Sequence, residues 1–164
     1  MTEPTRVLFV CLGNIIRSPL GARLFEHKAA EAGLAEKYAV DSAGTGDWHV
    51  GEPPDERMVR TAARRGFHYT DRARQVKAAD LDSFDLIIAM DPQNKLNLEA
   101  LAQNTEQRAK IRLMREFDPQ AGGDMTVPDP WYAGPNGFDD AYDIIERSVE
   151  QLLAELEAGR LTPA

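Results

Sequence analysis

The sequence predicts an α/β fold in which helices cover both faces of a four-stranded parallel sheet. Four apolar runs rich in β-branched residues recur along the chain, and a stretch long enough for a helix separates each run from the next. The third run is continuously apolar from Leu86 to Ala89, which is typical of a strand covered on both faces. This alternation favours right-handed crossovers and three layers. The strands are expected at residues 7–10, 38–43, 85–90 and 111–114.

The first helix is expected at residues 19–32, directly after the loop that follows the first strand. Ser18 is a residue type that caps helix N-termini, and Pro19 fits the first helical position. Gly33 fits the position just beyond the last turn, where a helix stops.

Three further helices are expected. Residues 54–65 carry acidic side chains near their start and arginines near their end, which matches the helix dipole. Asp91 is expected to cap a helix over residues 92–101, where a proline occupies the first position. The longest helix is expected at residues 138–158, which carry a continuous apolar stripe.

The length and charge of the chain limit the classes of protein to which it can belong. The 164 residues suit one domain, so residues 1–164 are expected to form a single unit, as a monomer or weak dimer. A formal net charge of −8 argues against nucleic-acid binding, because an acidic surface repels a polyanion. We also expect no membrane association, since the sequence shows neither a signal-peptide pattern nor a stretch able to span a bilayer.

Cysteine and histidine usage argues against a metalloprotein. A single cysteine allows neither an internal disulfide nor a thiolate-rich zinc site, and it is typical of a reducing, cytoplasmic setting. The three histidines are scattered along the chain. The sequence therefore predicts neither a metal nor a cofactor.

The cysteine itself lies where a predicted strand turns into a helix. Helix N-termini present unpaired N–H groups and a partial positive charge, which favour a thiolate and bind phosphate oxygens. Arg17, six positions after Cys11, can grip two of those oxygens bidentately, and Gly13 is expected to let the backbone turn sharply. The expected phosphate-binding residues are Leu12, Gly13, Asn14, Ile15, Ile16, Arg17 and Ser18.

This loop has the residues for nucleophilic catalysis by Cys11. A thiolate is a strong nucleophile toward phosphorus, and the Ser18 hydroxyl can hydrogen-bond the sulfur before and after attack. Asn14 is a residue type that tolerates a left-handed conformation, so it can brace the loop. We therefore expect a cysteinyl-phosphate intermediate.

Expelling a phenolate-like leaving group requires a proton donor, and Asp129 is the candidate. It lies in the stiff segment Val127-Pro128-Asp129-Pro130, which can hold a carboxyl over the leaving oxygen and later accept a proton from water. Trp48, Trp131 and Tyr132 lie in two turn-rich loops expected at the same sheet edge, and they can form a slot for a flat ring.

These residues also have purely structural interpretations. A lone cysteine can be a small buried hydrophobe, an aspartate between prolines can simply form a turn, and tryptophans can be packing residues. Packing alone, however, does not require a strand, an anion-binding loop and a helix start around Cys11. The catalytic interpretation is therefore favoured.

At these residues the sequence resembles the low-molecular-weight protein tyrosine phosphatases, whose loop reads Cys-x-Gly-Asn-x-Cys-Arg-Ser and whose acid lies in Asp-Pro-Tyr/Trp-Tyr. The similarity covers nearly the whole chain, including residues 41–46 and Ala73-Arg74-Gln75. It implies Cys11 as nucleophile, Arg17 as phosphate clamp and Asp129 as acid, on a four-stranded parallel sheet flanked by helices. It also implies a phosphotyrosine-containing protein substrate, for which a bacterial tyrosine kinase is one candidate.

The chain departs from the family pattern at two positions. Ile16 stands where the family has its second loop cysteine, which can form a protective disulfide with the nucleophile. Asp71 and Arg72 precede Ala-Arg-Gln where the family frequently has a histidine, so the resemblance implies an altered hydrogen-bond network around Asn14.

Because Ile16 cannot form that disulfide, we expect peroxide to inactivate the enzyme by oxidising Cys11 to sulfenic and then higher acids. The measurement is the activity recovered by a dithiol after increasing times in peroxide. Recovery should decline with exposure time, and full recovery after prolonged exposure would contradict the expectation.

Three other functions use related chemistry. A related arsenate reductase needs additional cysteines, which this chain lacks. Phosphoarginine phosphatases of the family tend to carry threonine where Ile15 stands, so the apolar Ile15 favours an aromatic ring. A sugar-transport phosphocarrier also places a phosphorylated cysteine after a first strand, but Arg17 and Asp129 favour hydrolysis.

Overall fold

Four parallel strands form the central sheet, in the spatial order β2-β1-β3-β4. In the computed structural model, which describes residues 3–132, 134 and 136–161, each strand matches an expected one with ends that differ by at most two residues. Cys11 is the last residue of β1 and is paired with Gly44, the last residue of β2. The strands are β1 (Thr5–Cys11), β2 (Tyr38–Gly44), β3 (Leu86–Ala89) and β4 (Ile111–Leu113).

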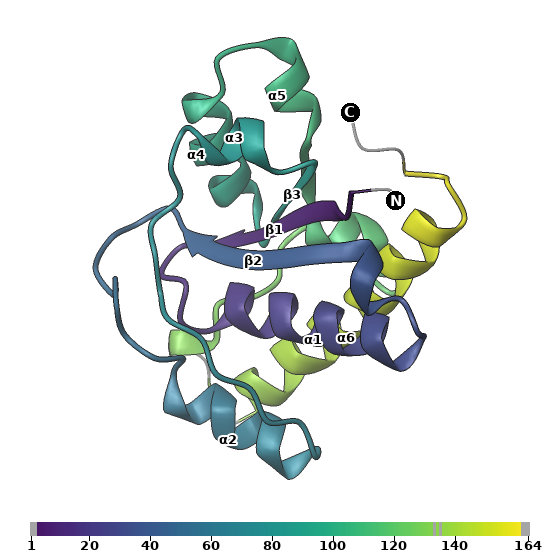
Figure 1. Cartoon of the computed structure of the whole chain (residues 1–164). Coiled ribbons are helices and arrows are strands. Elements are labelled where there is room, and N and C mark those ends of the chain that lie inside the picture. The colour runs from purple at the N-terminus through teal and green to yellow at the C-terminus, as the bar shows by residue number, and fades with distance from the viewer. Residues whose placement is uncertain (1–2, 133, 135, 162–164) are drawn as a thin grey trace.

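Helices cover both faces of this sheet, which confirms the predicted three layers (Figure 1). One face is covered by α1 (Arg17–Glu31) and α6 (Gly137–Glu157), with α2 (Glu56–Arg64) lying beside α6. The other face is covered by three shorter helices. They are α3 (Asp80–Ser83), α4 (Pro92–Leu101) and α5 (Thr105–Ala109).

The two faces of β1 enter two separate hydrophobic clusters. Val7 and Phe9 pack with buried residues of α1 and α6, whereas Leu8 and Val10 pack with buried residues of β3 and α4. Side chains alternate along a strand, so a strand that is apolar at every position must be covered on both sides. This double burial fixes β1, and with it the position of Cys11 at its end.

The expected helix ends are correct at Gly33 and Asp91, but α2 begins at Glu56 with Asp55 as its cap rather than at residue 54, and the expected cap at Ser18 is wrong. Gly33 adopts a positive φ of 76° beyond α1. Asp55 and Asp91 cap α2 and α4, because their carboxylates accept hydrogen bonds from backbone N–H groups in the first turn. Ser18, however, lies inside α1, which begins at Arg17, and its hydroxyl bonds the sulfur of Cys11 instead of capping the helix.

Three short 3-10 helices, η1 (Ala35–Lys37), η2 (Met114–Phe117) and η3 (Pro130–Tyr132), complete the described elements. They were not expected from the sequence, and neither were α3 and α5. Among the residues that the structure describes, no helix is long and apolar enough to cross a membrane.

Asp118 joins η2 to α6 in a buried charge cluster. Its fully buried carboxylate accepts hydrogen bonds from Arg115 at 3.0 Å and from Arg147 at 2.7 Å. Burial opposes its ionisation, but the hydrogen bonds from Arg147 and the Gln120 backbone, with the two positive charges, outweigh burial and lower the pKa of Asp118.

Replacing Asp118 by alanine is expected to lower the free energy of unfolding by about 3–5 kcal/mol, because two arginines lose their buried partner. Chemical denaturation measures this loss. Asp124→Ala is the matched control, since Asp124 pairs with the same Arg115 from an exposed position and should contribute under about 1 kcal/mol. Equal losses in the two variants would contradict a special role for the buried carboxylate.

The same cluster predicts a pH dependence of stability. The folded-state pKa of Asp118 lies below its ordinary value of 3.8, so its contribution is complete above that value. The contribution is lost as the pH falls through the folded-state pKa. Below about pH 4, therefore, the stability difference between the wild type and Asp118→Ala should shrink.

Candidate active site

Cys11 lies at the carboxyl end of β1, and the next five residues form a loop that leads into α1. Its sulfur is buried within 3.0 Å of the Ser18 Oγ and within 3.2 Å of the Asn14 backbone N–H. Two hydrogen-bond partners therefore face the sulfur from the loop and from the first turn of α1. The thiol is held in a polar cradle rather than packed only among aliphatic side chains.

The sequence predicts the sharp turn of this loop at Gly13. In the structure the turn lies at Asn14 instead. Asn14 has a φ of 58°, the only positive φ of a non-glycine residue in the described part of the chain. Its side chain braces the turn, because Nδ2 donates to Ser18 and Ser42, and Oδ1 accepts from the backbone N–H of Arg74. The predicted bracing role of Asn14 is thus matched by the geometry.

The loop turns several of its backbone N–H groups inward. The carbonyls of Cys11, Leu12 and Ile15 accept hydrogen bonds from Thr45, Gly46 and Asp55, which lie outside the loop. A trans peptide places its N–H opposite its C=O, so the N–H groups that follow these three carbonyls point away from those partners, into the loop. Such convergent N–H groups form an anion-binding concavity. These inward groups belong to Leu12, Gly13 and Ile16.

Two glycines allow the close packing around the loop. A Cβ on Gly44 would lie 2.8 Å from the Leu12 carbonyl oxygen, which is closer than real contacts allow. A Cβ on Gly13 would lie 3.1 Å from the ring of His49. Gly13 therefore lies close to His49, which would have to shift by a few tenths of an ångström to admit a Cβ, and its φ is not positive.

Arg17 extends from the first turn of α1 under the loop and is 97 % buried. Its Nη1 donates to Asp91 Oδ2 at 2.8 Å and to the Val127 carbonyl at 2.9 Å. Its Nη2 lies on the side of Asp129, 3.8 Å from Oδ2. With Nη1 anchored, the rest of the planar fork is available to bind an oxyanion, so Asp91 both caps α4 and fixes the arginine.

Asp129 lies over the same pocket at the end of the Val127–Pro128 segment. Its Oδ1 accepts a hydrogen bond from the Trp131 backbone at 3.0 Å, an Asx turn that fixes the carboxyl. Its Oδ2 is the oxygen nearest Arg17 and faces that guanidinium across the pocket. The backbone N–H of Val127 bonds the Met90 carbonyl at 2.8 Å, which ties this segment to the end of β3.

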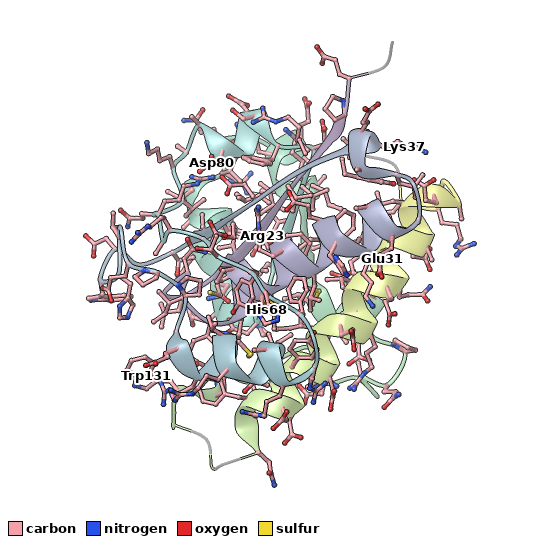
Figure 2. All side chains as sticks on the ribbon, turned by 60° about the horizontal axis from the view of Figure 1, so that its bottom comes forward. Arg23, Glu31, Lys37, His68, Asp80 and Trp131 are labelled. Atoms are coloured by element: carbon pink, nitrogen blue, oxygen red, sulfur yellow. The ribbon has the colours of Figure 1, made fainter. Side chains whose placement is uncertain are left out.

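The pocket above the sulfur has a volume of about 230 Å³. For comparison, an apolar cavity of about 150 Å³ suffices to bind benzene. Trp48 and Trp131 form exposed walls, with 67 % and 41 % of their surface accessible, and Figure 2 shows Trp131 at the edge of the molecule. The lining residues are Cys11, Leu12, Gly13, Ile15, Ile16, Arg17, Trp48, His49, Asp129 and Trp131.

Arg57 supports the wall formed by Trp131. Its guanidinium lies 4.9 Å from the Trp131 ring centroid and 4.8 Å from that of Phe138, and it forms two side-chain hydrogen bonds with Asp55. Burial opposes ionisation of Asp55, but the hydrogen bonds from Arg57 outweigh burial and lower the Asp55 pKa. The Asp55 N–H also bonds the Ile15 carbonyl. The ion pair of Asp55 and Arg57 therefore connects the active-site loop to the segment that carries Trp131.

Most of the predicted site residues thus meet at one pocket, and three further residues join them. The sequence did not predict that His49 lines the pocket or that Arg57 contacts Trp131. It predicted Asp91 as a helix cap but not as a partner of Arg17. The side chain of Tyr132, which was expected in the ring slot, lies outside the described part of the structure. Among the described residues, no group of three or more His, Cys, Asp or Glu side chains is placed to hold a metal ion.

A parallel α/β sheet with an anion-binding Cys-x5-Arg loop after its first strand and a carboxyl over the same pocket defines an α/β phosphatase. The chain belongs to the low molecular weight phosphotyrosine protein phosphatase family, whose model matches residues 6–161. It is therefore a protein tyrosine phosphatase, and its substrates are phosphoproteins.

Relatives match the chain along almost its full length. A low molecular weight protein-tyrosine-phosphatase of Streptomyces coelicolor is 41% identical over 150 residues, which cover 91% of this chain and 92% of the relative. A crystal structure of a protein tyrosine phosphatase from Entamoeba histolytica superposes with a TM-score of 0.90 at 38% identity, covering 96% of this chain and 99% of that one. The structure of a Drosophila arginine phosphatase has a TM-score of 0.84 at 32% identity, covering 92% and 97%.

Proposed function

We propose that this chain hydrolyses phosphotyrosine through a phosphate ester of Cys11, with Arg17 as the phosphate clamp and Asp129 as general acid and base. The observation that supports this most is the meeting of all three side chains at one pocket, with the sulfur at its base and two tryptophans at its walls. We also propose that residues 1–164 form a single catalytic domain built on one sheet.

In the first step, the Cys11 thiolate attacks phosphorus and the bond from phosphorus to the tyrosine oxygen breaks. Asp129, protonated at Oδ2, gives its proton to that oxygen, so tyrosine leaves as a neutral phenol. Arg17 and the inward N–H groups of the loop hold the non-bridging oxygens, where negative charge must be stabilised.

In the second step, water attacks the cysteinyl-phosphate while the Asp129 carboxylate takes a proton from it. The sulfur–phosphorus bond breaks, and inorganic phosphate and the thiolate are released. The Ser18 hydroxyl, 3.0 Å from the sulfur, stabilises this thiolate as the leaving group. Together the two steps return Cys11 and Asp129 to their starting states, and they consume only the phosphate ester and water.

Asp129→Ala is expected to lower kcat/KM by about a hundredfold, because the leaving oxygen loses its proton donor in the first step, which is the step that kcat/KM reports. The loss should grow as the leaving group becomes more basic and shrink for aryl phosphates with acidic phenols. Steady-state assays across a series of substituted phenyl phosphates measure this dependence. An equal loss for every leaving group would contradict the role of general acid in the first step.

Two other phosphoryl functions are distinguished by the same assay. A phosphocysteine carrier would release a single stoichiometric burst of phenol, whereas we expect steady release of phenol and phosphate. The similarity to an arginine phosphatase makes phosphoarginine the second substrate to test. The buried, apolar Ile15 lines the pocket and favours an aromatic ring over a guanidinium. A phosphotyrosine peptide should therefore be hydrolysed faster than a phosphoarginine peptide.

The substrate that we propose is a phosphotyrosine-containing protein, and a bacterial tyrosine kinase that carries phosphotyrosine is one candidate. We further propose that the enzyme acts in the cytoplasm, in keeping with its single thiol, and that it is a monomer or weak dimer. Substrate trapping with Cys11→Ser in a native cell extract, followed by identification of the retained phosphoprotein, tests the candidate. Retention of proteins without phosphotyrosine would argue against it.

A further inference from the structure

The ring of Trp48 folds back onto the backbone of Gly46, two residues before it. A Cβ built on Gly46 would lie 2.7 Å from Cη2 of that ring and closer still to two further ring carbons, Cε3 and Cζ3. Real Cβ atoms essentially never come within 3.0 Å of such a neighbour, so any side chain on residue 46 would overlap the ring. The missing side chain of Gly46 is therefore what leaves room for the ring where it lies.

We propose that Gly46 determines substrate specificity by setting the position of Trp48. Trp48 is one of the two tryptophan walls of the pocket, whereas Gly46 itself is not among the lining residues. The proposal rests on the proposed function, because the position of this wall matters only where a phosphotyrosine ring binds beside it. Gly46 acts through Trp48, so it is a positioning residue and not a catalytic one.

The backbone under the ring is fixed to the active-site loop. The Gly46 N–H donates to the Leu12 carbonyl at 2.9 Å, and the Thr45 N–H donates to the Cys11 carbonyl at the same distance. The Thr45 carbonyl accepts a hydrogen bond from Gln75 Nε2 at 3.2 Å. Figure 1 shows this segment leaving the tip of β2 and continuing toward α2. The ring therefore rests on backbone that keeps its place relative to the phosphate-binding loop.

The backbone that follows Trp48 is held as well, and only the Trp48 side chain has room to move. The Glu52 N–H donates to the His49 carbonyl at 2.8 Å, and the Gly51 N–H donates to the Ala73 carbonyl at 2.8 Å. The Trp48 side chain, by contrast, belongs to a residue that is 67 % exposed. A methyl group added under the ring would therefore be accommodated by a swing of the ring and not by a shift of the backbone.

This separates Gly46 from Gly44, the other glycine in the same turn. A Cβ on Gly44 would meet the Leu12 carbonyl oxygen, which is part of the loop itself. A Cβ on Gly46 would meet only the Trp48 ring among its three nearest atoms. A ring displaced from Gly46 swings either out to solvent or across the mouth of the pocket. Both movements remove the wall that a phosphotyrosine ring would contact, and both leave the phosphate-binding groups in place.

The test is Gly46→Ala, and its first readout is equilibrium binding in the Cys11→Ser background, which needs no turnover. The dissociation constant for a phosphotyrosine peptide should rise by about fivefold, the equivalent of one aromatic pair. The dissociation constant for inorganic phosphate should be unchanged, because Arg17 and the inward N–H groups keep their positions. In the active enzyme, KM for the peptide should rise while kcat stays unchanged.

The second readout is the fluorescence of Trp48, which reports on the ring directly. The chain has two tryptophans, so Trp131→Phe leaves Trp48 as the only one and keeps an aromatic ring at the other wall. In this background, Gly46→Ala should change the emission maximum of Trp48 and its quenching by acrylamide, because the ring leaves the backbone that covers it. This measurement requires no phosphatase activity.

A double-mutant cycle with Trp48→Ala separates an effect on the ring from an effect on the loop. If Gly46 acts only through the ring, then Gly46→Ala causes no further loss of peptide affinity in the Trp48→Ala background. Gly134→Ala is the matched control, since it adds the same methyl group to another exposed glycine, where the Cβ meets no atom of the described structure within 4 Å. It should leave peptide affinity and Trp48 emission unchanged.

Three results would overturn the proposal. They are a folded Gly46→Ala protein with wild-type peptide affinity or wild-type Trp48 emission, losses that add fully to those of Trp48→Ala, and equal losses of phosphate and peptide binding, which would indicate a shifted loop. Failure of the proposed function would be distinct, because a wild type that hydrolyses no phosphotyrosine peptide would still give Trp48 emission and phosphate binding for every variant.

Discussion

Cys11→Ser is expected to abolish turnover, lowering kcat for an aryl phosphate by a factor of at least about 10⁴. A serine hydroxyl is not ionised at neutral pH, and the two hydrogen-bond partners of the Cys11 sulfur include no base to activate it. Its partners, the Ser18 hydroxyl and the Asn14 N–H, suit a thiolate. Phosphate release under substrate saturation is the measurement.

The control for this variant is the binding of phosphate itself. The inward N–H groups and Arg17 are unchanged in Cys11→Ser, so inorganic phosphate should still bind and protect the protein against thermal unfolding. A variant that has lost activity and phosphate binding together would indicate a collapsed loop. A variant that still turns over at more than about a hundredth of the wild-type rate would contradict nucleophilic catalysis by Cys11.

Arg17→Lys is expected to lower kcat/KM by about a thousandfold, although it keeps the positive charge. Nη1 of Arg17 is already engaged by Asp91 and the Val127 carbonyl, and only the planar fork leaves further N–H groups for phosphate. A lysine ammonium is a single point that must choose between Asp91 and the substrate. The scale of the loss follows that of arginines that stabilise phosphoryl transfer, about 10³ or more.

The matched control is Arg60→Lys, an exposed arginine of α2 that pairs with Glu56 away from the pocket. Its kinetics should equal those of the wild type. If Arg17→Lys retained more than about a tenth of the wild-type kcat/KM, bidentate binding by Arg17 would not be the source of phosphate recognition.

The sheet could be predicted from the sequence because its strands are buried on both faces. A run such as Leu86–Ala89 has no polar position, and few structures other than a covered parallel strand explain it. Long helices were also predictable, because their apolar stripes and terminal glycines are local signals. The short α3 and α5 lack enough turns to show a periodicity, so they were missed.

The loop itself could be predicted in outline, but its internal geometry could not. Ser18 precedes a proline and matches a cap, yet its hydroxyl bonds the thiol, which became its neighbour only through the folding of the loop. Likewise, Gly13 matches a turn, whereas the left-handed residue is Asn14, held by Ser42 and Arg74 from distant segments. Local propensity gave way to tertiary hydrogen bonds at these positions.

The residues that were missed act through long-range contacts. Asp91 shows a capping signal, and nothing in its neighbourhood indicates that its second oxygen will bind an arginine 74 positions away. Arg57 shows no local signal for its contacts with Trp131 and Phe138. Such pairings arise where loops meet at the carboxyl edge of the sheet, and a single sequence does not record which loops meet there.

The most direct test of the account is to trap the covalent intermediate. Wild-type and Asp129→Ala proteins are quenched in acid during turnover of an aryl phosphate, and the phosphorylated peptide is identified by mass spectrometry. We expect the phosphate on Cys11, bound through sulfur and lost on chase without substrate. Steady turnover with no phosphate on Cys11, or with phosphate on another residue, would contradict the proposed mechanism.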